Sequence, residues 1–262
     1  MPSAAASATS EDAFLGGALR VRQPAAGYRA GLDAVLLAAA APLGGNHPER
    51  VLDVGAGVGV VGLAVARRAG EARVTMVERE PTLVALCRLN ILANGLGERA
   101  RIINADVGRP LAGQAELLQL KESFEHVLAN PPYQVEGAGT ASSLPEKAAA
   151  HAMPEAELET WLRFMAAMAL PGGSATMIHR ADRLSQVLSA FSRRFGRLLV
   201  FPIFPRRGAA AHRVLVQGIK GSRAPLQIRP GLILHEDGPG FRPEIDCILR
   251  GGAALDLSTA PN

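Results

Sequence analysis

From residue 50 onward, short apolar runs of strand length alternate with longer segments of helical periodicity. Parallel strands need a crossover of a dozen or more residues between them, usually a helix, so this alternation predicts a parallel sheet with helices on both faces. The predicted fold class is therefore α/β, with a doubly wound, mostly parallel, Rossmann-like sheet. The expected strands are 51–54, 74–78, 101–106, 124–129 and 175–179, and the expected helices are 60–69, 81–94, 155–170 and 181–195.

The sequence after residue 195 departs from this alternation. Segments 198–204 and 212–220 both have the composition of strands, and the turn between them contains Pro205-Arg206-Arg207-Gly208. That turn is too short for a crossover helix, so we expect an antiparallel strand pair near the C-terminus of the sheet. From Leu226 onward we expect a short extended addition to the sheet edge.

The residues before the first expected strand form an appendage. Gly16-Gly17 separates two short extended runs, which predicts a hairpin, and Asp33 stands where the N-cap of a helix over 34–41 is expected. The first residues are rich in Ala and Ser without a basic n-region or a sustained apolar run, which indicates a disordered tail and not a signal peptide. The predicted organisation is a tail over 1–12, an appendage over 13–45 and one α/β domain over 46–262.

Composition bounds the core and the compartment. Of the 262 residues, 48% are hydrophobic but only 4% are aromatic, so the core has to be built largely from Ala, Val and Leu, which suits a buried parallel sheet. Two cysteines, Cys87 and Cys247, argue against a disulfide framework, and no apolar run is long enough to span a bilayer. We expect a cytoplasmic protein without a membrane partner.

A glycine-rich loop, Asp53-Val-Gly55-Ala-Gly57-Val-Gly59, follows the first expected strand. Glycine lets the backbone approach a ligand closely, and the loop lies at the carboxyl edge of the strands, where open α/β sheets bind ligands. Glu78 ends the second expected strand, where a carboxylate can accept hydrogen bonds from both ribose hydroxyls of a nucleoside cofactor. Asp106 ends the third, where it can accept a hydrogen bond from an adenine amine.

The glycine loop alone leaves two cofactor classes open. Gly57-Val-Gly59-Val-Val-Gly62 matches the dinucleotide fingerprint, with Glu78 about 20 residues further on, so it fits NAD as well as S-adenosylmethionine. Three features favour S-adenosylmethionine: Asp53 inside the strand, Asp106 at a third strand end, and the sequence after the fourth strand. An NAD-dependent oxidoreductase gives no reason for the last of these.

The fourth expected strand runs into Asn130-Pro131-Pro132-Tyr133. An adenine or amide NH2 is a poor nucleophile because its lone pair is delocalised, and two fixed acceptors for its N–H bonds favour a localised lone pair as the methyl group arrives. The Asn130 side-chain oxygen, which also faces the cofactor, and the Pro131 carbonyl can supply these acceptors. The two prolines stiffen the loop, and Tyr133 offers a ring for stacking. The sulfonium donor is already activated, so no metal is needed. Alone, Asn-Pro also occurs in ordinary turns.

The combination of Asp53-Val-Gly-Ala-Gly-Val-Gly with Asn130-Pro-Pro-Tyr resembles the class I amino-methyltransferases that act on adenine N6 or glutamine N5. The segment Gly27-Tyr-Arg-Ala-Gly-Leu-Asp-Ala-Val-Leu-Leu-Ala is similar to the one that precedes the glycine loop in the bacterial valine-tRNA adenine-37 N6-methyltransferase family. The resemblance runs from about Phe14 to Leu257. It implies the class I methyltransferase fold over 46–262, S-adenosylmethionine as cofactor and tRNA as partner. It also implies that Tyr28 and Asp33 line the donor site at the methionine end of the cofactor.

Basic residues can serve a nucleic-acid partner. The chain has 28 Lys and Arg against 24 Asp and Glu, a formal net charge of +4, which permits such a partner without demanding one. An arginine cluster suits phosphate contacts, but the solvated surface of an Arg-rich protein gives the same pattern. The candidate RNA-binding residues are Arg193, Arg194, Arg197, Arg206, Arg207 and Arg213.

The expected function is methyl transfer from S-adenosylmethionine to the N6 amine of an adenine in tRNA, in the anticodon loop because that loop exposes its bases. A protein-glutamine N5-methyltransferase uses the same tetrapeptide, but those enzymes carry an extra helical N-terminal domain, for which the roughly 50 residues before the first strand are too few. The other hypotheses are an rRNA or DNA amino-methyltransferase, an NAD-dependent oxidoreductase and a non-catalytic RNA-binding module.

Overall fold

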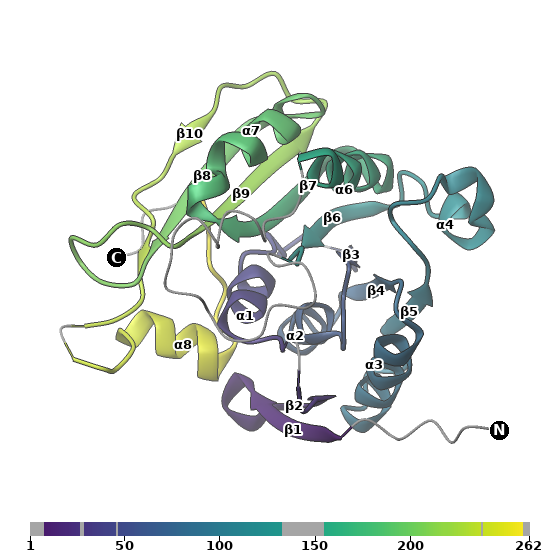
Figure 1. Cartoon of the computed structure of the whole chain (residues 1–262), viewed down its shortest axis with the longest axis horizontal. Helices are drawn as coiled ribbons and strands as arrows, with labels where there is room; N and C mark the ends of the chain where they lie inside the picture. Colours follow the sequence, from purple (N-terminus) through teal and green to yellow (C-terminus); the bar gives the residue numbers. More distant parts are fainter. Residues whose placement is uncertain (1–7, 27–28, 46, 133–154, 237, 259–262) are drawn as a thin grey trace.

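The computed structural model describes residues 8–26, 29–45, 47–132, 155–236 and 238–258, and its centre is a nine-stranded sheet (Figure 1). The strand order is β10-β8-β9-β7-β6-β3-β4-β5, and β11 also pairs with β8. The strands are β3 (Arg50–Val54), β4 (Arg73–Glu78), β5 (Ala100–Asn104), β6 (Phe124–Ala129), β7 (Ala169–Arg180), β8 (Phe195–Phe204), β9 (Arg213–Lys220), β10 (Gln227–Ile228) and β11 (Leu232–Ile233).

The sheet is parallel except at β9. Strands β5, β4, β3, β6 and β7 pair in parallel, whereas β9 lies antiparallel between β7 and β8. The predicted antiparallel pair is confirmed, and since β9 alone reverses direction, β8 runs parallel to β6. The short strands β10 and β11 extend the β8 edge, as expected for the residues after Leu226.

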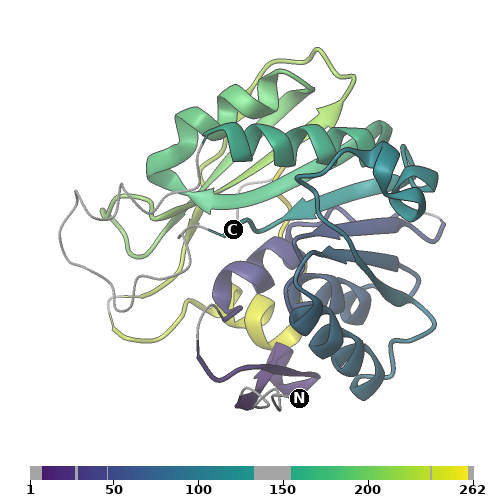
Figure 2. The ribbon, with the colours of Figure 1, turned by 45° about the vertical axis from the view of Figure 1, so that its right-hand side comes forward.

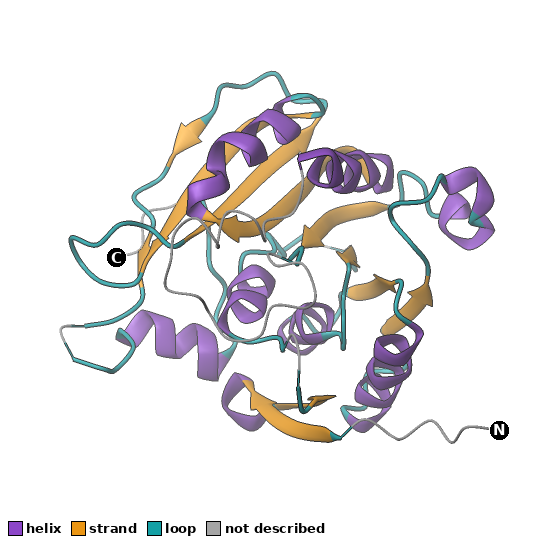
Figure 3. Cartoon of the chain, viewed as in Figure 1, coloured by secondary structure: helices purple, strands orange, loops and turns teal. Residues whose placement is uncertain are grey.

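Helices cover both faces of the sheet, which confirms the doubly wound Rossmann-like fold (Figure 3). On one face lie α1 (Leu32–Ala39), α2 (Val60–Arg68) and α3 (Pro81–Ala93), and on the other lie α4 (Ala115–Gln119), α6 (Glu155–Met168) and α7 (Leu184–Ser192). Figure 2 shows the two helical layers from a second side. No helix in the described ranges is both long enough and apolar enough to cross a bilayer.

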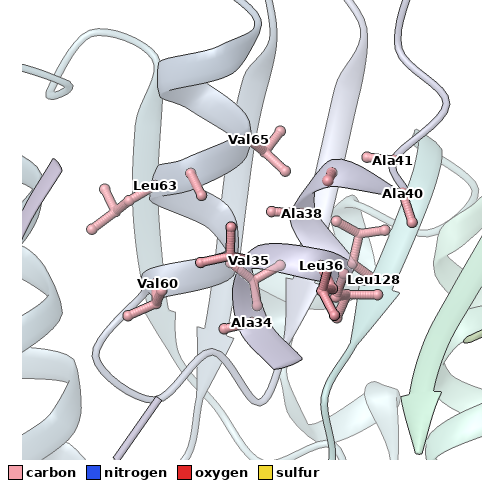
Figure 4. Packing of buried hydrophobic residues seen from close by; sticks show 14 of the residues in the cluster. Ala34, Val35, Leu36, Ala38, Ala40, Ala41, Val60, Leu63, Val65 and Leu128 are labelled. Atoms are coloured by element: carbon pink, nitrogen blue, oxygen red, sulfur yellow. The ribbon is translucent and has the colours of Figure 1, made fainter. Parts of the chain in front are cut away.

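Each helical layer has its own hydrophobic core. Side chains of α1, α2 and β6 share one cluster, in which Val35, Leu63 and Leu128 are buried (Figure 4). The second core, under α6 and α7, contains Trp161 and Phe191. Most members of the first cluster are Ala, Val and Leu, as the low aromatic content requires.

The N-terminal hairpin shares the first of these cores. Strands β1 (Thr9–Phe14) and β2 (Leu19–Pro24) pair antiparallel around a short 3-10 turn, η1 (Leu15–Gly17), and Leu19 and Val21 are fully buried. The predicted hairpin is confirmed, but its first strand begins at Thr9, inside the stretch expected as a disordered tail. Pairing with β2 supplies the backbone hydrogen bonds that order these residues.

Two local expectations need correction. The N-cap of α1 is Gly31 and makes no side-chain cap, so Asp33 is not the N-cap but lies in the first turn. Strand β5 ends at Asn104, so Asp106 follows the strand by two residues and does not end it.

The C-terminal segment contains a helix that was not expected. Helix α8 (Pro243–Gly251) begins with Pro243 in its first turn, is capped by Gly252 and buries Ile245 and Ile248. It packs against α1 and η1, and the Leu255 N–H donates to the Ala39 carbonyl at 2.9 Å. The chain thus returns from the β8 edge to support the helix that precedes the glycine loop.

Candidate active site

An open cavity lies at the carboxyl ends of β3 and β6. Its wall is mostly apolar, with a few polar groups. The wall is formed by the end of β2, the segment that leads into α1, the glycine loop with the start of α2, helix α3 and the residue after β6. Its residues include Gln23, Ala30, Ala34, Asp53, Gly55, Gly57, Val60, Val61, Leu83 and Asn130.

The glycine loop meets Asn130 because β3 and β6 are neighbours in the sheet. Val54 pairs with Ala129, so Gly55 and Asn130 each follow the last paired residue of their strand. Asn130 is half-buried, Pro131 is buried and Pro132 is exposed. The structure thus brings Asn130, Gly55 and Gly57 into one cavity wall, whereas Gly59 is not among the lining residues. Tyr133 and Tyr28 lie outside the described residues.

Gly55 occupies a position where a side chain would not fit. Its φ is +67°, a backbone conformation that residues other than glycine rarely adopt. A Cβ placed there would lie 2.2 Å from the Trp161 ring. Gly57 has a similar φ of +57°, but a Cβ there would meet nothing within 4 Å. The glycine at position 55 is therefore needed for packing as well as for the turn.

Asp53 ties β3 to the start of α2. Its carboxylate is almost fully buried and accepts the Gly62 N–H at 2.9 Å. Burial raises the pKa of Asp53 from the ordinary 3.8 to about 7, against the hydrogen bond from Gly62, and the nearby Glu78 adds to the rise. A carboxyl with this pKa changes its charge near neutral pH.

Asp53 makes the stability of the protein depend on pH. Because its pKa is raised in the folded state, the folded chain holds a proton that the unfolded chain loses between about pH 4 and 7, so the free energy of unfolding falls as the pH rises through this window, by about 4 kcal/mol at most. Asn at position 53 keeps an acceptor for Gly62 and does not titrate. We expect Asp53→Asn to gain stability relative to the wild type from pH 5 to pH 8, measured by urea unfolding. A difference that stays constant with pH would contradict this.

Glu78 holds the glycine loop from the neighbouring strand. One carboxylate oxygen accepts the Gly57 N–H and the other accepts the Glu80 N–H, both at 2.9 Å. Each oxygen keeps a second lone pair for a ligand. Glu78 therefore organises the loop whether or not it also contacts a cofactor, a task that sequence analysis did not assign to it.

Asp106 is not among the residues that line the cavity, and neither is Glu78. Its Oδ1 accepts the Gly108 N–H at 2.8 Å, and its carboxylate lies 3.7 Å from the Arg109 guanidinium. The Gln114 side chain bonds both the N–H and the carbonyl of Asp106, which fixes the backbone here.

Asp33 is engaged by an arginine from the far end of the chain. Its Oδ2 accepts a hydrogen bond from Arg213 Nε at 2.7 Å, at the start of β9. The two residues that follow Asp33 on α1 point to the cavity and to the core: Ala34 lines the cavity, and Val35 is buried in the core. Asp33 thus joins α1 to β9 beside the site.

Gln23 is a polar residue of the cavity wall that sequence analysis missed. It is 1% exposed; its Oε1 accepts the Ala30 N–H at 2.9 Å, and its Nε2 donates to the Ala30 carbonyl at 3.3 Å and to Asp12 at 2.8 Å. The available signal was its place in the alternation of β2, in which Leu19, Val21 and Gln23 all point inward.

The candidate RNA-binding arginines divide between the two ends of β8. Arg193 and Arg194 precede β8 and share Glu159, at 3.9 and 2.6 Å, and Arg197 lies near the same end. Arg206 and Arg207 follow β8, at the carboxyl edge of the sheet, where Asn130 also lies. Arg206 donates to the carbonyls of Glu236 and Gly238. The ten residues of β8 span about 33 Å, so Arg193 and Arg194 lie far from Arg206 and Arg207.

Comparison with protein families gives one match over half of the chain. Residues 32–164 match the family described as methyltransferase small domain. The matched range runs from the start of α1 beyond Asn130, so it includes the glycine loop and the acceptor motif.

Curated relatives share a narrower description. A protein of Shewanella sp. (strain W3-18-1) is 30% identical over 152 residues, which are 58% of this chain and 60% of the relative. A protein of Shewanella amazonensis is 43% identical over 101 residues, or 38% of this chain and 40% of the relative. Both are named tRNA1(Val) (adenine(37)-N6)-methyltransferase. The chain thus matches less than two thirds of either relative.

Among solved structures, a protein of Agrobacterium tumefaciens described as a predicted O-methyltransferase superposes with a TM-score of 0.71. It is 34% identical, and the alignment covers 86% of this chain and 98% of that one. The tRNA (m1A58) methyltransferase of Aquifex aeolicus superposes with a TM-score of 0.50 at 18% identity, over 76% of this chain and 72% of that one, and shares the fold.

Proposed function

Because the chain belongs to the methyltransferase small-domain family, we propose that it transfers a methyl group from S-adenosylmethionine to the N6 amine of an adenine in tRNA. The observation that carries the proposal is the position of Asn130 in the wall of the same cavity as the glycine loop. Donor and acceptor can meet only where their two sites share one space. We further propose that the enzyme works in the cytoplasm, and that the adenine lies in the anticodon loop.

The residues around the cavity fit the cofactor. The glycine loop leaves backbone open to the ligand at Gly55 and Gly57, which line the cavity. Glu78 has lone pairs left for ribose hydroxyls, and Asp106 is our candidate for the adenine amine. Asp53 provides a carboxylate within the cavity wall. Tyr28 and Asp33 are assigned to the methionine end by resemblance alone.

The acceptor residues perform the positioning. Bound S-adenosylmethionine supplies an electrophilic methyl group on a sulfonium. The Asn130 side-chain oxygen and the Pro131 carbonyl accept the two N–H bonds of the amine, which directs its lone pair at the methyl group. Since Pro131 is buried and trans like every other described peptide bond, the loop is held before the substrate arrives. Tyr133 is our candidate for stacking on the base.

The class of acceptor can be tested by measuring whether the methyl label goes into RNA or into protein. The purified protein is incubated with tritiated S-adenosylmethionine and a mixture of unmodified tRNA and a glutamine-containing release-factor protein. We expect acid-insoluble label that ribonuclease removes and protease does not. Label that only protease removes would show that the acceptor is glutamine in a protein and not adenine in tRNA.

The arginines after β8 are the better candidates for RNA phosphates. Arg207 is exposed and has no partner in the part of the chain that the structure describes, whereas Arg194 is paired with Glu159. We expect Arg206→Gln with Arg207→Gln to weaken tRNA binding about tenfold and to lower the slope of log K against log salt by about 1.5. The matched control, Arg193→Gln with Arg194→Gln, should leave the slope unchanged. Equal effects of the two pairs, measured by filter binding, would contradict this assignment.

A further inference from the structure

Two asparagines, Asn90 on α3 and Asn94 at its C-cap, hold the backbone of β2. The Arg22 N–H donates to Asn90 Oδ1 at 2.8 Å, and Asn90 Nδ2 donates to the Arg22 carbonyl at 3.0 Å. Asn94 repeats this with Arg20, at 3.0 and 2.7 Å. Four residues of helix rise about 6 Å and two residues of strand about 6.6 Å, so the two side-chain amides match the strand as a neighbouring strand would.

Asn90 differs from Asn94 in one further contact. Its Nδ2 also donates to the Val58 carbonyl at 3.0 Å, in the glycine loop, and its side chain is 1% exposed. Asn94 Nδ2 instead donates to the Asn90 carbonyl within its own helix. Asn90 alone of the two joins the hairpin to the loop that lines the cavity.

The register of β2 decides which residue enters the cavity. Gln23 follows Arg22 directly and is buried in the cavity wall. Its side-chain amide is hydrogen-bonded to both the N–H and the carbonyl of Ala30. A shift of β2 by one residue would exchange its inward and outward side chains and remove Gln23 from the wall. By fixing Arg22, Asn90 therefore fixes Gln23 and, through it, Ala30.

We propose that Asn90 is a positioning residue of the cofactor site, which sets the glycine loop through Val58 and the opposite wall through Arg22 and Gln23. The inference rests on the proposed function for the identity of the ligand, S-adenosylmethionine. Asn90 does not line the cavity, so it acts on the ligand only through these neighbours.

The matched variants are Asn90→Ala and Asn94→Ala. Both remove a clamp on β2, but only the first also removes the bond to the glycine loop. We expect Asn90→Ala to weaken S-adenosylhomocysteine binding about tenfold in calorimetry, and to raise the KM for S-adenosylmethionine more than the KM for tRNA. Asn94→Ala should bind within about twofold of the wild type. A folded Asn90→Ala protein with wild-type affinity, or equal weakening in both variants, would overturn the inference.

A second variant covers the case in which Asn90→Ala does not fold. Asn90→Asp keeps the acceptor for the Arg22 N–H but loses the donor to the Arg22 and Val58 carbonyls, so it should weaken cofactor binding at least as much. Wild-type affinity in this variant would also overturn the inference. Failure of the wild type itself to bind S-adenosylhomocysteine would instead refute the proposed function, so the two failures are distinguishable.

Discussion

Replacing Asn130 by alanine is expected to reduce methyl transfer by at least about 10²–10³-fold, the range for loss of one preorganised polar group in a catalytic site. The substitution removes the side-chain acceptor that directs the lone pair of the amine. The glycine loop, Asp53 and Glu78 remain in place, so the affinity for S-adenosylhomocysteine should change by less than about tenfold. Single-turnover methylation and calorimetry on the same preparation measure the two quantities.

The ratio of these two effects is the informative result. Asn130 is half-buried at a strand end, so its truncation leaves the two cores intact, and thermal unfolding should shift little. An Asn130→Ala protein that binds cofactor and still methylates at the wild-type rate would remove Asn130 from the acceptor site. Equal loss of cofactor binding and activity would assign it to the donor side alone.

Gly55→Ala is expected to destabilise the protein by about 2–4 kcal/mol in the absence of any ligand, because overpacking and backbone strain act together. The added Cβ would lie 2.2 Å from the Trp161 ring while φ is +67°. Gly57→Ala is the matched control, since it has nearly the same φ and open space around the added Cβ, and should lose only about 1 kcal/mol. Urea unfolding of the two variants gives the difference.

A second substitution separates packing from strain at position 55. In a Trp161→Phe background the ring atoms nearest Gly55 are absent, so Gly55→Ala should then cost about as much as Gly57→Ala. If Gly55→Ala and Gly57→Ala are equally destabilising in the wild-type background, the contact with Trp161 does not explain the glycine.

The sheet could be predicted from the sequence because buried parallel strands are continuous apolar runs separated by helices. The C-terminal end of β6 was predicted to the residue, since Asn130-Pro131 stops the strand. Helix α8 was not predicted, although Pro243 and Gly252 mark its two ends, because only its contact with α1 explains why Ile245 and Ile248 are buried.

The centre of the site was predictable for a topological reason. Strands that run parallel end at one edge, so the glycine loop after β3 and Asn130 after β6 were expected at the same edge. They are neighbours because β3 pairs with β6 in the strand order. The tasks of Asn90 and Arg213 depend on contacts between distant parts of the chain: 68 residues separate Arg22 from Asn90, and 180 separate Asp33 from Arg213. No local pattern contains such pairs.

The positions of the arginines in space also could not be predicted from the sequence. Neighbours in sequence, such as Arg197 and Arg206, lie near opposite ends of one strand, so the cluster that the sequence suggests is two clusters in space. A count of charges cannot make this distinction, but the direction of β8 does.

Nucleoside analysis of the methylated product tests the central proposal most directly. Unmodified tRNA is incubated with labelled S-adenosylmethionine and either the wild type or Asn130→Ala, then digested and separated by mass spectrometry. The wild-type reaction should yield labelled N6-methyladenosine, and the Asn130→Ala reaction should yield none above background. Label in guanosine or in protein, or N6-methyladenosine formed equally by both enzymes, would contradict the assignment of this chain as an adenine-N6 methyltransferase that acts through Asn130.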